Sequence, residues 1–110
     1  MINVGVVVYT QGKSPGIYDA QWSHSTNGFG TGRLTGGPVS GVEGIYKALY
    51  FDEEGKDKFS LELTIRKEGG DYALAYTLDG ETICTGLGKL VGDSLVAGYT
   101  FSNAKWLDRQ

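Results

Sequence analysis

The feature that most constrains the fold is a two-residue alternation of apolar and polar side chains that recurs along the chain. In the segment FSLELTIRK, Phe59, Leu61, Leu63 and Ile65 share one face, and the residues between them are polar. Such alternation is typical of a half-buried antiparallel strand. No segment keeps the 3.6-residue period of an amphipathic helix over three turns. Three further segments alternate in the same way: IYDAQWSH (17–24), DYALAYTL (71–78) and SLVAGYTF (94–101).

Turn dipeptides separate these segments at short, regular intervals. Asn27-Gly28 and Asp79-Gly80 are strong hairpin signals. Regular spacing of short strands and turns favours an all-β sandwich or barrel. The runs between the turns predict about eight strands, near residues 2–10, 17–24, 28–35, 41–51, 58–67, 71–78, 81–90 and 94–102.

Short connections favour one connectivity for these strands. A Greek key needs at least one long connection, so an up-and-down meander is expected. Pairing of the first and last strands would remove both open edges of the sheet. The first strand, with Val4, Val6 and Val8 in line, is the expected partner of the last. We therefore predict a single domain, residues 1–110, folded as an eight-stranded antiparallel up-and-down meander barrel.

Composition narrows the function classes. The net charge is −3 and lysines and arginines do not cluster, so nucleic acid is not an expected partner. No apolar run approaches the ~20 residues of a membrane-spanning helix. Cys84 is the only cysteine, which favours a reducing, cytoplasmic location. The first ten residues alternate like a strand and not like a signal peptide, although a secreted or periplasmic location stays open.

Two glycine-rich segments, GFGTGRLTGG (28–37) and TGLGKLVGDSL (85–95), allow two interpretations. A dinucleotide-binding loop would need a helix directly after the glycines. Here a β-alternating run or a Gly-Gly-Pro turn follows instead. Gly30 and Gly32 share one strand face, as do Gly86 and Gly88. We therefore expect strands that leave room for aromatic rings inside a barrel.

The residues that could carry chemistry are few. His24 is the only histidine, which excludes a site with two or three histidine ligands but leaves a single haem ligand open. Cys84 has no cation near it in sequence that would lower its pKa, so a buried structural thiol is expected. The carboxylates lie in turns or on polar faces. We therefore expect no catalytic set, no metal and no cofactor.

Tyrosine and tryptophan pairs spaced four residues apart place several rings on shared strand faces. Such rings either fill the barrel or line a cavity for a small apolar ligand, and a cavity of about 300 Å³ would distinguish the two. The candidate lining residues are Tyr18, Trp22, Tyr46, Tyr50, Tyr72, Tyr76 and Tyr99.

The strand and glycine pattern also carries a resemblance. The segments PGIYDAQWS, GTGRLTGG, GVEGIYKALYFDEEG, DYALAYTLDGETICTGLG and GDSLVAGY together resemble the small bacterial lipocalin-like barrels of the calycin group. In the G-x-W pattern of calycins, Ala20 stands here in the glycine position before Trp22, and no ligand residues are carried over. The Ile-Tyr opening and the glycine-rich second hairpin are similar to lipocalin-like repressors that bind bacterial secretion-system regulators.

The resemblance implies a barrel that holds a small apolar ligand or presents its outer sheet to a protein. The leading hypothesis is a non-enzymatic small-molecule-binding barrel. The alternative is a protein-interaction or regulatory module with a filled barrel, such as a homodimer, that uses the face with Ile45, Leu49 and Phe51.

Overall fold

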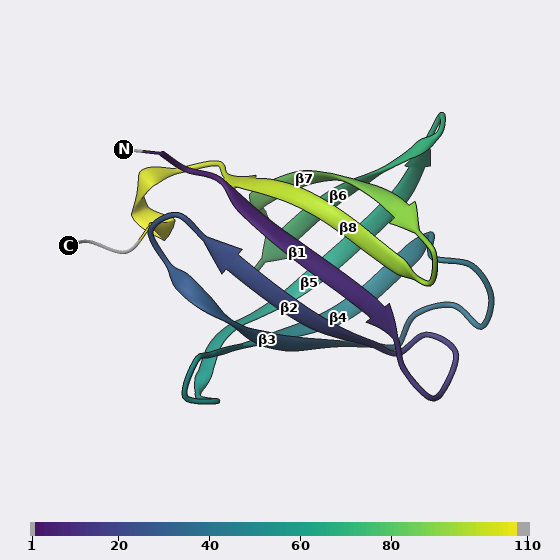
Figure 1. The fold of residues 1–110 in the computed structure, drawn as a ribbon. Coiled ribbons are helices and arrows are strands. Elements are labelled where there is room, and N and C mark those ends of the chain that lie inside the picture. Colours follow the sequence, from purple (N-terminus) through teal and green to yellow (C-terminus); the bar gives the residue numbers. More distant parts are fainter. Residues whose placement is uncertain (1, 108–110) are drawn as a thin grey trace.

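The computed structural model describes residues 2–107 and shows an all-β closed barrel (Figure 1). Its strands follow one another around the barrel in chain order, each antiparallel to the next, and β1 pairs with β8 from Gly5↔Tyr99 to Thr10↔Ser94. The predicted up-and-down barrel is confirmed, as is the closing pair. The eight strands within the described residues are β1 (Gly5–Gln11), β2 (Tyr18–His24), β3 (Gly28–Thr35), β4 (Gly44–Asp52), β5 (Asp57–Glu68), β6 (Asp71–Leu78), β7 (Glu81–Val91) and β8 (Ser94–Phe101).

The alternation along each strand separates a buried interior from an exposed exterior. In β2, Tyr18, Ala20 and Trp22 are buried, and the residues between them are exposed. In β1 the interior residues are Val7 and Tyr9. The valine row that helped to predict this strand faces outward, with Val6 56% exposed. Because the side-chain period is two, a one-residue change of phase exchanges the two faces of a strand.

Glycines in β3 and β7 allow close packing, of an interior ring at Gly32 and of neighbouring backbone at Gly30 and Gly86, so the expected room for rings is found at Gly32. A Cβ atom at Gly30 would collide with the carbonyl oxygen of Phe51, and one at Gly32 would lie 2.7 Å from the ring of Tyr50. A Cβ at Gly86 would lie 2.5 Å from the Gly98 carbonyl oxygen. Strand β7 runs on to Val91, with no helix after these glycines.

One end of the barrel, which we call the Asn27 end, carries the β2–β3, β4–β5 and β6–β7 turns. After β8 the chain forms a short 3₁₀ turn, Ala104–Trp106, at this same end (Figure 1). Trp106 and Leu107 pack against the core. The sequence did not predict this turn. No helix in residues 2–107 has the length and hydropathy needed to cross a membrane.

Candidate functional site

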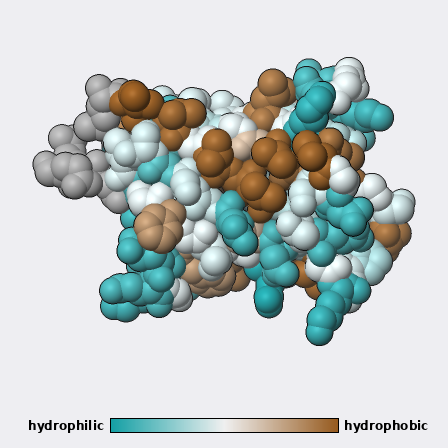
Figure 2. Space-filling model, viewed as in Figure 1, coloured by the Kyte–Doolittle hydropathy of each residue, from teal (hydrophilic) through white to brown (hydrophobic). Residues whose placement is uncertain are grey.

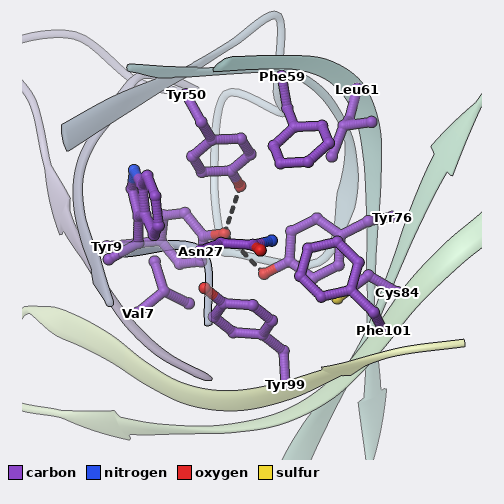
Figure 3. Close-up of a pocket in the computed structure, with 11 residues that line it drawn as sticks. Val7, Tyr9, Asn27, Tyr50, Phe59, Leu61, Tyr76, Cys84, Tyr99 and Phe101 are labelled. Carbon is purple, nitrogen blue, oxygen red and sulfur yellow. Dashed lines mark hydrogen bonds between the residues drawn. The ribbon is translucent and has the colours of Figure 1, made fainter. Parts of the chain in front are cut away.

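The barrel interior contains a cavity of about 40 Å³ in the half nearest the Asn27 end. Such a space exceeds the ~10–15 Å³ needed for one water molecule. It is far below the ~300 Å³ of a typical ligand pocket. Figure 3 shows aromatic side chains converging on it from several strands. The cavity is lined by Val7, Tyr9, Trp22, Asn27, Tyr50, Phe59, Leu61, Tyr76, Cys84, Tyr99 and Phe101.

Three buried tyrosines share a hydrogen-bond chain beside this cavity. The hydroxyl of Tyr9 lies 2.6 Å from that of Tyr50 and 2.7 Å from that of Tyr76 (Figure 3). The half-buried Tyr99 donates its hydroxyl proton to the backbone carbonyl of Ser23 at 3.1 Å. Each of these hydroxyls therefore has a partner within the protein, and none depends on a ligand to satisfy it.

Burial keeps the acidic groups of the interior protonated. It raises the pKa of Tyr9, Tyr50 and Tyr76 well above the ordinary value for tyrosine. Burial also raises the pKa of the Cys84 thiol to about 12. At neutral pH the cavity wall therefore offers neither a tyrosinate nor a thiolate, the forms that act as base or nucleophile.

Trp22 lines one side of the cavity, and its indole is hydrogen-bonded to the backbone of β3 and β4. Its indole N–H donates to the carbonyl oxygens of Thr31 and Phe51, each at 3.1 Å. Gly30, opposite Trp22 in the β2–β3 register, leaves space for the Phe51 carbonyl oxygen that accepts from the indole. The ring is thus held by two strands, and its only side-chain donor is occupied.

Polar side chains and the 3₁₀ turn close the Asn27 end. The side-chain amide of Asn27 donates to the carbonyl oxygen of Trp106 at 3.2 Å. Nδ1 of His24 accepts from the backbone N–H of Thr26 at 3.1 Å, which leaves Nε2–H to donate to Asn3 Oδ1 at 3.0 Å. His24 therefore has a structural role at this end. The indole N–H of Trp106 is buried without a hydrogen-bond partner among the described residues.

The structure brings four of the seven predicted lining residues to the cavity, namely Trp22, Tyr50, Tyr76 and Tyr99. Tyr18 and Tyr46 are buried but pack edge-to-face on each other, with ring centroids 5.8 Å apart, away from the cavity. Tyr72 is only partly buried against the core. Binding of a ligand by any of these residues stays a prediction.

The sequence did not predict Tyr9, the tyrosine at the centre of the hydrogen-bond chain, as a lining residue. Its strand was recognised from the valine row on the opposite face, so the interior phase of Val7 and Tyr9 was overlooked. Asn27, which the sequence predicts only as a turn residue, also lines the cavity. The signal for Tyr9 was present, because it continues the alternation that begins at Gly5.

Residues 2–107 contain no cluster of side chains that could hold a metal ion. No group of three or more histidine, cysteine or carboxylate side chains there is close enough to hold a metal ion. Asp19 and Arg33 lie 3.6 Å apart at the surface, and Lys89 and Asp71 lie 3.0 Å apart. These exposed pairs lie on the outside of the barrel.

The outer surface, in contrast, exposes apolar side chains. Val6, Leu87 and Val96 are 56%, 59% and 39% exposed and lie around Gly98 on β1, β7 and β8. Apolar side chains gather over β1 and β8 in Figure 2. On the predicted face of β4, Ile45 is exposed, and Leu49 and Phe51 are half-buried.

Comparison of the chain with protein families, with curated proteins and with solved structures finds no match in any of the three. The eight-stranded up-and-down barrel is consistent with a lipocalin-like architecture.

Proposed function

We propose that this chain is a non-enzymatic protein-interaction module in which the filled barrel is a rigid scaffold. One observation carries the proposal: the interior leaves about 40 Å³ unfilled, against the ~300 Å³ of a typical ligand pocket. The hydroxyls of Tyr9, Tyr50 and Tyr76 hydrogen-bond to one another, so none of these three needs a small molecule as a partner.

The outer surface supports the same proposal. Contiguous exposed apolar side chains on the surface of a domain commonly mark a contact site for another molecule. Here they cover the outside of β1, β7 and β8, and the outward face of β4 adds Ile45, Leu49 and Phe51. The lipocalin-like resemblance allows this use of a barrel, with its outer sheet presented to a protein.

A small apolar ligand inside the barrel is the second candidate. Its support is the aromatic lining of the cavity, to which four predicted residues contribute. A ligand larger than a few atoms would have to displace Asn27 and the residues around Trp106, which close the nearest end. The two candidates therefore differ in whether the interior stays closed.

Native mass spectrometry of the protein purified from its own host tests the choice. We expect the mass of the chain alone, or of the chain with a protein partner. A retained small molecule that is lost in a Tyr50→Trp variant, where the larger ring fills the cavity, would overturn the proposal in favour of the second candidate. An Ile45→Trp variant, changed on the outside of the barrel, is the matched control.

A second copy of the chain is one partner that this module could bind. Light scattering over a range of concentrations gives the mass in solution. A dimer that Val96→Arg dissociates and Ile45→Arg does not would place the contact on β1, β7 and β8, and the reverse pattern would place it on β4. A monomer at every concentration would indicate a different protein as the partner.

We further propose that the chain has no catalytic function, binds no cofactor and works in the cytoplasm. Support comes from the structural role of His24 and from the buried, protonated thiol of Cys84. An enzymatic activity of the purified protein that disappears in both His24→Ala and Cys84→Ala, while folding is retained, would contradict this part of the proposal.

A further inference from the structure

The exterior of β1 to β4 forms a continuous groove. Two hollows, of about 760 and 530 Å³, adjoin along it and share Val8, Gln21 and Thr31 in their walls. One hollow reaches Asp19 and Arg33, and the other reaches Phe29, Asp52 and Glu53. Both are far larger than the interior cavity. We call this feature the outer groove.

The strand register gives the groove a defined cross-section. Val8 on β1 pairs with Gln21 on β2, Gln21 with Thr31 on β3, and Thr31 with Phe51 on β4. The two outer members are apolar and the two inner members are polar. Val6 and Leu49 continue the apolar walls, and Ser23 continues the polar floor. The outer groove is therefore a polar floor between two apolar walls.

This cross-section matches the chemistry of an extended peptide. In an extended chain, side chains alternate to two opposite sides, and the backbone N–H and C=O groups point at right angles to them. A peptide lying along the groove would place alternate side chains against the walls on β1 and β4. Its backbone would face the amide of Gln21 and the hydroxyls of Ser23 and Thr31. None of these three side chains has a hydrogen-bond partner in the part of the chain that the structure describes.

In a closed barrel, a peptide can bind only through side chains of the outer face and not by pairing with a strand edge. A peptide usually joins a sheet by pairing with an exposed edge strand. All eight strands of residues 2–107 are paired on both sides, so no edge is available. Side chains of the floor must supply the polar contacts instead. The β2 segment from Asp19 to Ser23 covers about 13 Å of the groove, and the turn residues extend it, which suits roughly five or six extended residues.

Charge distinguishes the two ends of the groove. At one end Asp19 lies 3.6 Å from Arg33, so the two charges offset each other. At the other end Asp52 and Glu53 line the wall; the positive charges of Lys56 and Lys58 act on Asp52, but neither lysine lines the groove. A hydrogen bond from the backbone N–H of Lys56 lowers the pKa of Asp52, so this carboxylate stays ionised. The second end is therefore suited to a cationic side chain.

We propose that the outer groove binds an extended peptide segment of a partner protein, with apolar side chains on alternate positions and a lysine or arginine beside Asp52 and Glu53. This inference rests on the proposed function and names the surface and the partner class. The exposed apolar residues on β7 and β8 lie outside the groove and are not part of this site.

Selection of displayed random hexapeptides on the folded, full-length chain tests the inference. We expect the selected peptides to carry apolar residues at alternate positions and a basic residue near one end. The affinity of a selected peptide should fall at least about tenfold in Thr31→Arg, because the arginine occupies the floor. Thr100→Arg, an exposed outward threonine on β8, should leave it unchanged.

A second pair of variants tests the charged end. Glu53→Gln should weaken binding about two- to fivefold, the range expected for one exposed ion pair. Glu54→Gln, its neighbour outside the groove, should have no effect. Equal thermal unfolding of Thr31→Arg and Thr100→Arg shows that loss of binding is not loss of folding.

Failure of this inference and failure of the proposed function give different results. Selected peptides without the alternating pattern, or with unchanged affinity for Thr31→Arg, overturn the groove. Binding that is lost in Val96→Arg and kept in Thr31→Arg also overturns the groove but retains an interaction module. A small molecule retained inside the barrel overturns the proposed function itself.

Discussion

At the scale of single residues, Tyr9 organises the interior. Its hydroxyl contacts those of Tyr50 and Tyr76, which come from strands on other sides of the barrel. A buried hydroxyl costs free energy unless it is hydrogen-bonded, so each member of the chain depends on the others. The polar atoms thus select one arrangement of rings among the many that would fill the same volume.

Replacement of Tyr9 by phenylalanine tests this role. The change leaves the ring in place but removes the shared partner of two buried hydroxyls. We expect the free energy of unfolding to fall by about 1–3 kcal/mol, measured by urea denaturation. Tyr72→Phe, at a partly buried site, is the control and should change stability by less than about 0.5 kcal/mol. Equal effects of the two substitutions would show that the hydrogen-bond chain contributes nothing of its own.

At the scale of elements, glycine decides whether β3 and β4 can lie side by side under Trp22. Gly30 pairs with Trp22 on one side and Asp52 on the other, and the carbonyl oxygen of Phe51 occupies the position of a Cβ atom. Any side chain at this position would push the two strands apart. The same carbonyl accepts from the indole N–H, so the displacement would also break that hydrogen bond.

Gly30→Ala should therefore destabilise the protein by about 1–3 kcal/mol, the usual cost of overpacking. Thermal unfolding is a sufficient measurement. Gly70→Ala provides the comparison, because a Cβ atom there meets nothing within 4 Å. If both variants unfold at the temperature of the wild type, space at Gly30 is not limiting.

The 3₁₀ turn Ala104–Trp106 is the element that shields the cavity from the Asn27 end. Cys84 lines that cavity, is buried and has a pKa raised to about 12 by burial, so it should react slowly with a disulfide reagent. Trp106→Ala should increase the labelling rate by about tenfold or more at neutral pH, since exposure controls thiol reactivity.

The destabilised Tyr9→Phe variant controls for general opening of the barrel, because its substitution lies on β1 and leaves the turn itself unchanged. Faster labelling in Trp106→Ala than in Tyr9→Phe would assign the effect to the turn. Equal rates would show that the thiol is reached by unfolding of the whole barrel.

The strands could be predicted from the sequence, whereas the 3₁₀ turn at the Asn27 end could not, and both outcomes have the same physical reason. Each strand carries its own alternation, so β2, β3 and β6 were placed within one residue of their observed bounds. A three-residue turn such as Ala104–Trp106 is too short to have a period. Its position depends on contacts with Asn27 and the core, which the local sequence does not encode.

At the scale of the whole molecule, closure of the barrel could be predicted, because both edge strands need a partner. How far side chains fill the interior could not be predicted, because no local pattern determines it. Whether the rings of Tyr50 and Tyr76 fill a barrel or line a cavity depends on their volume relative to the barrel, and so on strand tilt and rotamers. The prediction of lining residues therefore identified rings that lie in the interior but could not give the volume of the cavity. The outer groove was missed because it depends on the register of four strands.

The protonated interior predicts alkaline unfolding. In the unfolded chain, tyrosines ionise near pH 10, whereas burial keeps Tyr9, Tyr50 and Tyr76 protonated in the fold to a higher pH. Above pH ~10 the unfolded state therefore binds fewer protons, and the free energy of unfolding falls. Each such tyrosine contributes about 1.4 kcal/mol per pH unit. The stability is fully present below this range.

Urea denaturation between pH 8 and 11, with tyrosinate absorbance as a second signal, checks this expectation. Tyrosinate from the buried residues should appear together with unfolding and not before it. Tyr9→Phe should have a shallower decline, because one buried proton is removed. Ionisation of all seven tyrosines in a protein that is still folded would contradict the buried environment.

The pairing of β1 with β8 also has a consequence for how the chain reaches its native state. Every other strand pair within residues 2–107 joins neighbours along the chain and can form outward from the short connection between them. The last seam joins Gly5 to Tyr99, across nearly the full length of the polypeptide. Ring closure carries the largest loss of chain entropy, so it is the step on which the folding rate should depend most. The first and last strands meet there, and a covalent link between them would reduce the entropy that is lost when the barrel closes.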